Sequence, residues 1–233
     1  SDETVERIAK LGQIAHRDFR VFWDNAYAVH HLDAQAPELT SIFAATRRHG
    51  TEDSVLQFAS TSKITHAGAG VAFMAASTSN LAGLKQYLSA CTIGPDKVNQ
   101  LRHAHFLPNR EALLDHMQKH AALLQPRFAA VLKALEENFA DTCLGSWETP
   151  RGGYFVSFDT RPGCAREIVR LAAEAGVKLT PAGATFPYGE DPEDRNIRIA
   201  PSVPSIEEVV GAMEVFVVCV KLASVRRALA AQG

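Results

Sequence analysis

The sequence predicts an α/β protein in which a mostly parallel sheet is followed by a smaller α+β domain. Two apolar runs, at residues 20–23 and 55–59, have the composition of strands, and a helical pattern lies between them. Strand, helix and strand in this order form the unit from which parallel sheets are built. A nearly unbroken helical pattern at residues 96–139 then leads to a second group of short elements. We therefore predict two domains, at residues 1–124 and 125–233.

A separate residue pattern predicts each of the other helices and strands of the first domain. Apolar residues three apart predict an amphipathic helix over residues 1–15. A second helix is expected to begin at Pro37, a residue favoured in the first turn, and to end near Gly50, a residue favoured after the last turn. Residues 71–74 predict a third strand, and residues 80–90 predict the helix that follows it.

The rest of the chain predicts a small α+β domain. Pro108 and Pro126 are expected to divide the long helical stretch, because proline interrupts the hydrogen bonds of a helix. A turn-rich segment at residues 143–153 marks the entry to the second domain. Ser205 and Glu208 have the spacing of a capping box at the start of a helix. The further elements predicted here are strands at 154–158, 177–179 and 196–199 and a helix at 165–175.

Composition and charge narrow the possible functions. The chain has 233 residues, of which 46% are hydrophobic and 21% charged, a balance typical of globular proteins. Its net charge of -2 gives no basic face for nucleic acid, and no apolar run approaches the roughly 20 residues of a spanning helix. We therefore expect neither a nucleic-acid nor a membrane partner, and a cytoplasmic location. The four cysteines and nine histidines lack the spacing of a disulfide framework or a metal site.

Lys63 is the residue with the strongest chemical signal. It follows the strand at 55–59 and stands among serine, threonine, alanine and glycine residues. Desolvation at the end of a buried strand favours a neutral, nucleophilic amine, which suits imine formation with a carbonyl group. A solvated surface lysine is the alternative. A Walker-type phosphate loop is excluded, because none of the ten residues before Lys63 is a glycine.

Two other groups of residues belong with this lysine. Asp24 and Tyr27 follow the strand at 20–23, and Arg198 lies within the predicted strand at 196–199. If the first two strands are parallel, Asp24 and Lys63 emerge at the same edge of the sheet. Ligands bind at this edge in open α/β sheets. The pattern therefore predicts a small-molecule site that combines an amine with a carboxylate.

In order and spacing, these motifs resemble the fold-type I pyridoxal-phosphate enzymes of the aspartate aminotransferase superfamily. The segments DNAYAVHHL at 24–32, STSKITHAGAG at 60–70 and RGGYFV at 151–156 are most similar to the bacterial aspartate-aminotransferase branch related to MocR-type proteins. The resemblance covers essentially the whole chain. It implies that residues 1–124 are the C-terminal part of the large cofactor-binding domain and that residues 125–233 are the small C-terminal domain.

The resemblance implies a role for each residue around the cofactor ring, pyridoxal 5'-phosphate. Lys63 joins the cofactor through an imine and later moves the proton at the substrate Cα. Asp24 keeps the pyridine nitrogen protonated, so that the ring accepts electrons. Tyr27 hydrogen-bonds the phenolic oxygen of the ring, and Ala26 lies against its face.

The resemblance also implies which residues bind the cofactor phosphate and the substrate. Ser60 and Ser62 resemble the phosphate-binding hydroxyls of the family, and Arg198 matches the arginine that clamps the substrate α-carboxylate. The chain departs from the family where many members have a phosphate-binding arginine shortly after the lysine, because residues 68–71 are Gly-Ala-Gly-Val. It also lacks the long N-terminal segment of the family, so we expect a piece of a longer protein.

The activity implied is transamination of aspartate or a related amino acid with 2-oxoglutarate, by a homodimer. Three alternatives remain open at this point. A pyridoxal-phosphate β-lyase would use the same residues, since the choice of reaction depends on which bond at Cα lies perpendicular to the ring. A MocR-type regulatory module would use the cofactor site to sense a metabolite. The chain could also be a folded but catalytically inactive remnant.

Overall fold

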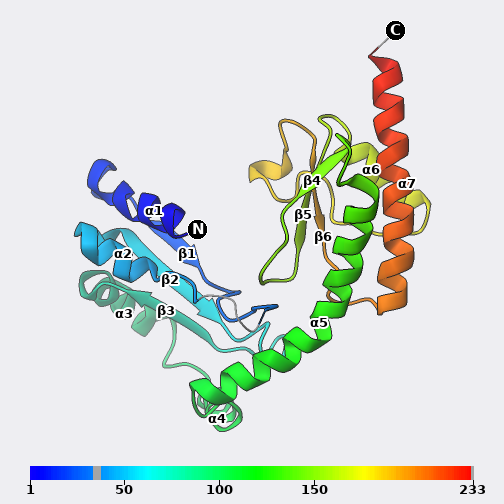
Figure 1. The fold of residues 1–233 in the computed structure, drawn as a ribbon. Coiled ribbons are helices and arrows are strands. Elements are labelled where there is room, and N and C mark those ends of the chain that lie inside the picture. Colours follow the sequence, from blue (N-terminus) through cyan, green and yellow to red (C-terminus); the bar gives the residue numbers. More distant parts are fainter. Residues whose placement is uncertain (34–37, 232–233) are drawn as a thin grey trace. The chain divides into compact units, whose positions relative to one another are not determined.

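The computed structural model describes residues 1–33 and 38–231, which divide into two units (Figure 1). Unit 1 comprises residues 1–29 and 38–117, and unit 2 comprises residues 30–33 and 118–231. The division falls inside one long helix, α5 (Arg110–Phe139). The domain ranges expected from the sequence stay a prediction.

The sheet of unit 1 has the strand order β1-β2-β3, with bounds Val21–Asp24, Val55–Ser60 and Ala72–Ala76. β1 and β2 are parallel, with Asp24 opposite Phe58, as the sequence predicts. β3 is antiparallel to β2, so only one of the two strand pairs is parallel. The reason is the short loop of residues 61–71, since a parallel return would need a crossover of a dozen or more residues.

Helices α1 (Asp2–Ile14) and α2 (Ile42–His49) pack against the sheet of unit 1. Their apolar faces and β2 form a small buried core of Val5, Ala9, Ile42, Ala45 and Val55. On β1, Phe22 remains 70% exposed and stacks on Phe58, with 5.6 Å between the ring centroids.

The start of α2 differs from the prediction. Pro37 lies outside the described residues, and residues 38–41 are not helical. The helix begins instead after Ser41, whose hydroxyl oxygen accepts a hydrogen bond from the amide of Ala44. Serine is a favoured capping residue because it satisfies an amide that has no partner within the helix. The end at Gly50 is confirmed, and a short 3₁₀ turn, Glu52–Ser54, leads into β2.

Helices α3 (Thr78–Cys91), α4 (Lys97–Phe106) and α5 follow β3. Pro108 separates α4 from α5 as predicted, whereas Pro126 lies inside α5, so the prediction that it ends a helix is wrong. The residues after it, Phe128, Val131 and Leu135, are buried in the core of unit 2. Packing of this kind offsets the hydrogen bond that a proline removes.

Unit 2 contains an antiparallel sheet and two further helices, with one 3₁₀ turn, Pro187–Gly189. The strand order is β4-β5-β6, with bounds Gly145–Trp147, Val156–Thr160 and Asn196–Ile199. The helices are α6 (Ala165–Glu174) and α7 (Ile206–Ala230), and α7 begins with the predicted capping box of Ser205 and Glu208. Among the described residues, no helix combines the length and the apolar character needed to cross a membrane.

Two predictions in unit 2 are wrong, and one strand was not predicted. The unpredicted strand is β4, which lies in the turn-rich segment of residues 143–153. Gly145 allows its backbone to approach Phe158, since a Cβ at Gly145 would lie 2.1 Å from that ring. β5 begins at Val156 rather than at residue 154. Residues 177–179 are not a strand. The Val177 amide donates instead to the Ala172 carbonyl, 2.8 Å away, which closes the end of α6.

A pH-dependent ion pair joins α6 to α7. Glu167 accepts hydrogen bonds from Arg170 and Arg226, and the paired guanidinium groups lower the pKa of Glu167 from 4.5 to about 2 against the opposing effect of desolvation. The folded state therefore gains stability from this group above about pH 4.5 and loses it as the pH falls towards 2.

We expect Glu167→Gln to lower the free energy of unfolding by about 1 kcal/mol at neutral pH, a value discounted for the partial exposure of the pair. Urea denaturation at about pH 7 and about pH 3 measures the effect, which should shrink to less than half at the lower pH. Glu174→Gln is the matched control, because the Glu174 side chain is 61% exposed and pairs with Arg170 within α6. A loss for Glu167→Gln that is equal at the two pH values contradicts this assignment.

Candidate functional site

A closed loop carries Lys63 at the carboxyl end of β2. The Thr61 amide donates to the Val71 carbonyl (3.0 Å), and the Val71 amide donates to the Thr61 hydroxyl (2.8 Å). These two hydrogen bonds join the ends of the loop of residues 61–71. Within it, the Ile64 amide donates to the Thr61 carbonyl (2.9 Å), which forms the turn that presents Lys63. Backbone hydrogen bonds and the Thr61 hydroxyl therefore close the loop that carries the lysine.

Lys63 lies over an aromatic ring and remains exposed. Its Nζ is 5.1 Å from the centroid of the Tyr27 ring. A cation over an aromatic face at an exposed site gains about 0.5–1 kcal/mol. The prediction that Lys63 is desolvated is wrong for the described chain, because Lys63 is exposed and does not belong to the buried core of unit 1.

Asp24 and Tyr27 are placed by the turn that follows β1. The Asn25 amide donates to the Phe58 carbonyl (2.8 Å), so β1 stays paired with β2 up to the turn. Asp24 Oδ1 then accepts a hydrogen bond from the Ala26 amide at 3.1 Å. Since β1 and β2 are parallel, Asp24 and the Lys63 loop follow the same edge of the sheet. Asp24 is exposed at this edge, and Ala26 and Tyr27 are partly buried.

Ser60 and Ser62 bring two hydroxyl groups together beside Lys63. Their Oγ atoms are 2.7 Å apart, and the Ser62 amide donates to Ser60 Oγ at 3.0 Å. This arrangement requires a glycine at position 70, because a Cβ there would lie 2.4 Å from Ser62 Oγ and 2.8 Å from its amide nitrogen. The two adjacent hydroxyls are hydrogen-bond donors of the kind that binds phosphate groups.

Arg198 belongs to unit 2, whereas the other predicted residues belong to unit 1. It lies in β6, and the centre of its guanidinium group is 4.5 Å from the centroid of the Phe155 ring. Its Nε is buried and has no hydrogen-bond partner among the described residues. Arg198 also lines a cavity of about 440 Å³ together with Lys178 and Thr180. A buried donor without an acceptor is costly, which favours an anionic ligand here.

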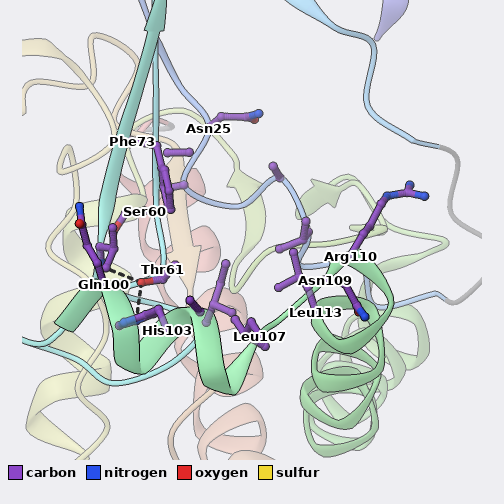
Figure 2. A pocket seen from close by; sticks show the side chains of 17 residues that line it. Asn25, Ser60, Thr61, Phe73, Gln100, His103, Leu107, Asn109, Arg110 and Leu113 are labelled. Carbon is purple, nitrogen blue, oxygen red and sulfur yellow. Dashed lines mark hydrogen bonds between the residues drawn. The ribbon is translucent and has the colours of Figure 1, made fainter. Parts of the chain in front are cut away.

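A second cavity, of about 600 Å³, adjoins the Lys63 loop (Figure 2). Asn25, Ala26, Ser60 and Thr61 line it next to the strand ends, and residues of α4 and of the start of α5 also line it. Figure 2 shows His103 of α4 directed at Thr61, and His103 Nε2 is 3.0 Å from the Thr61 hydroxyl.

Sequence reasoning missed the contribution of α4. The available signal was the spacing of Asn99 and His103, two polar residues four positions apart and therefore on the same face of a helix. Among residues 1–33 and 38–231, no group of three His, Cys, Asp or Glu side chains has an arrangement that could hold a metal ion.

Comparisons with known proteins agree with the predicted resemblance. A family model described as aspartate amino-transferase matches residues 1–232. A protein of Mycolicibacterium smegmatis named as an aminotransferase is 44% identical over 224 residues, and an aspartate aminotransferase of Corynebacterium glutamicum is 42% identical over 224 residues. Each alignment covers 96% of this chain and 52% of the relative. The chain thus spans about half the length of the curated relatives it matches.

Solved structures have the same fold as this chain. A crystal structure of an aspartate transaminase from Corynebacterium glutamicum matches with a TM-score of 0.92 and 42% identity, over 97% of this chain and 53% of that one. An α-aminoadipate aminotransferase from Thermus thermophilus, complexed with N-(5'-phosphopyridoxyl)-L-leucine, has a TM-score of 0.76 and 22% identity, over 97% of this chain and 55% of that one. The predicted fold, a part of fold type I of the pyridoxal-phosphate-dependent enzymes, is confirmed. The chain belongs to the aspartate amino-transferase family.

Proposed function

We propose that the full-length protein is a pyridoxal-phosphate-dependent aminotransferase, a cytoplasmic homodimer that transfers the amino group of aspartate or a related amino acid to 2-oxoglutarate. The observation that carries the proposal is the placement of Lys63. It lies at the carboxyl end of β2, 5.1 Å above the Tyr27 ring and at the same sheet edge as Asp24. The family and the names of the relatives support the transaminase reaction.

The residues present fit the cofactor. Pyridoxal 5'-phosphate supplies an aldehyde and, as a protonated ring, an electron sink for the bond broken at the substrate Cα. Lys63 offers the primary amine for the aldehyde, and Ser60 and Ser62 offer hydroxyls 2.7 Å apart for the phosphate. The glycine at position 70 leaves room for the Ser62 hydroxyl, because a Cβ there would lie 2.4 Å from Ser62 Oγ.

Each residue at the sheet edge has a distinct task in this proposal. Lys63 binds the aldehyde and, once released by the incoming amine, moves a proton at the substrate Cα. Asp24 holds a proton on the ring nitrogen, because a nearby carboxylate favours the cationic form. Tyr27 donates a hydrogen bond to the phenolic oxygen. Ala26 leaves room for the ring, because its side chain is a single methyl group.

Arg198 is the proposed ligand of the substrate α-carboxylate. Its buried Nε without a partner offers a hydrogen bond, and the guanidinium group can bind a carboxylate in a bidentate manner. The Phe155 ring, whose centroid is 4.5 Å from the centre of the guanidinium group, restricts the movement of this side chain, so less side-chain entropy is lost on binding. Aspartate as the amino donor is supported by the name of the Corynebacterium glutamicum relative, 42% identical to this chain.

The proposed activity is tested with the full-length protein and added cofactor. We expect oxaloacetate and glutamate to form in equal amounts from aspartate and 2-oxoglutarate. Release of pyruvate and ammonia from cysteine, measured in parallel, reports β-lyase activity and is expected to be much slower. Sedimentation of the same sample is expected to give a dimer. If neither reaction exceeds the rate without protein while the cofactor is bound, the aminotransferase proposal is contradicted and a sensing role is favoured.

A further inference from the structure

We propose that α4 positions Lys63, and that Asn99 and His103 are positioning residues for the reaction. The inference rests on the proposed function, since the loop of residues 61–71 carries the lysine that binds the cofactor there. Neither residue lies in the motifs that identify the family in this sequence, and α4 is separated from Lys63 by more than thirty positions. The contacts below connect this helix to the loop.

His103 joins the helix to the first turn of the loop. Its Nδ1 is 2.8 Å from the Asn99 carbonyl oxygen, which can only accept, so Nδ1 carries the proton. In the neutral ring, Nε2 is then an acceptor, and it lies 3.0 Å from the Thr61 hydroxyl and 2.8 Å from the Thr65 hydroxyl. Since Thr61 Oγ accepts from the Val71 amide, its proton is available for His103. These hydroxyls flank Lys63 on both sides in the sequence.

Asn99 holds the last part of the loop. Its side-chain Nδ2 donates to the Ala69 carbonyl (2.9 Å) and to the Gly70 carbonyl (3.3 Å). A third contact comes from α5, where His116 Nε2 is 2.7 Å from the Ile64 carbonyl, next to Lys63. The loop is therefore held at its start, beside its lysine and at its end by side chains of two helices.

These contacts are not by-products of core packing. None of the residues of α4 is fully buried, and Val98, Leu101 and Phe106 are more than half exposed. By contrast, the loop side of the contact is shielded, since Thr61 is only 8% exposed. Hydrogen bonds shielded from water hold their geometry better than exposed ones. The polar contacts of α4 are thus directed at the loop that presents the lysine.

The contacts between the helices and the loop of residues 61–71 fix the position of the Lys63 amine. In the proposed reaction the amine must reach the aldehyde carbon and later the proton on the substrate Cα. A displacement of about 1 Å in a reacting group can cost about 100-fold in rate. A loop that is free to shift would lower the fraction of productive geometries without removing any group that binds substrate.

Two substitutions of His103 separate positioning from general stability. In His103→Gln, the terminal amide lies at the same distance along the side chain as Nε2 and can still contact the threonine hydroxyls. In His103→Asn, the amide corresponds to Nδ1 and reaches only the helix backbone. In the full-length holoenzyme we expect His103→Asn to lower kcat about 10-fold or more, with KM within about 3-fold of the unsubstituted enzyme. His103→Gln is expected to restore most of kcat.

A double-mutant cycle with Thr65→Val sharpens the test. The Thr65 hydroxyl is 2.8 Å from His103 Nε2 and also donates to the Thr61 carbonyl (3.2 Å). Because the two variants share the contact between Thr65 and His103, the loss in the double variant should be clearly smaller than the product of the two single losses, whereas independent effects would multiply. If His103→Asn does not fold, Thr65→Val against Thr65→Ser provides the same comparison, with serine expected to restore kcat. Thermal unfolding of each variant identifies losses that come from stability.

Borohydride reduction of the unsubstituted holoenzyme separates the two proposals. If Lys63 is not labelled, the proposed function fails. If Lys63 is labelled and the enzyme is active, equal kcat values for His103→Asn and the unsubstituted enzyme overturn the positioning role. Equal impairment of His103→Gln and His103→Asn also overturns it, as do multiplicative losses in the cycle.

Discussion

Replacement of Lys63 by alanine in the full-length protein is expected to lower kcat by at least about 10⁴-fold. The substitution removes the amine that binds the cofactor aldehyde and the base that moves the proton at the substrate Cα. Lys63→Arg should be nearly as inactive, because a guanidinium group keeps the charge over the Tyr27 ring but does not lose its proton. Formation of oxaloacetate from aspartate, measured at saturating cofactor, gives the rates.

Lys85→Ala is the matched control, because Lys85 is an exposed lysine on α3, outside the loop that carries Lys63. It should leave kcat unchanged. Circular dichroism should show that all three variants fold, since Lys63 is exposed and lies outside the core of unit 1. A Lys63→Arg enzyme with more than a tenth of the original kcat would show that charge, rather than a nucleophilic amine, is what the site requires.

Asp24→Asn is expected to lower kcat by about 10²–10³-fold. The amide cannot hold a proton on the ring nitrogen, so the bound ring loses its capacity as an electron sink. The substitution is nearly isosteric, and the asparagine oxygen can still accept the hydrogen bond that Asp24 takes from the Ala26 amide at 3.1 Å. The turn after β1 should therefore be preserved. The loss should appear in kcat, with cofactor affinity measured separately by titration.

Asp24→Glu also tests whether the negative charge is required, since it keeps the carboxylate and lengthens the side chain by one methylene group. It should retain more activity than Asp24→Asn. Asp18→Asn, an exposed aspartate before β1, serves as the control and should have no effect. If Asp24→Asn matches the unsubstituted enzyme, the carboxylate does not contact the ring, and the proposed orientation of the cofactor at this sheet edge is wrong.

The residues of the candidate site that directly follow a strand could be predicted from the sequence. The apolar run before Asp24 and the one before Lys63 predict two parallel strands, and the structure pairs them in that way, with Asp24 opposite Phe58. The same-edge placement of the amine and the carboxylate follows from this pairing alone. The sequence also predicts the capping box of α7, because Ser205 and Glu208 each bond to the backbone of the other, three positions away.

Properties that depend on distant packing could not be predicted. The exposure of Lys63 depends on what surrounds its loop, and the strand pattern of residues 55–59 does not contain this information. Pro126 remains in a helix because the residues after it are buried in unit 2. The contact between Thr61 and His103 spans 42 positions and joins a loop to a helix. The spacing of Asn99 and His103 places both on one helix face, but it does not identify the loop that they contact.

The most direct test of the central claim is the site of covalent attachment. The full-length protein is incubated with pyridoxal 5'-phosphate, reduced with borohydride, digested and mapped by mass spectrometry. The account predicts one phosphopyridoxyl group per chain, on the peptide that contains Lys63. Labelling of a different lysine, or a protein that binds the cofactor without any reducible bond to Lys63, would contradict it.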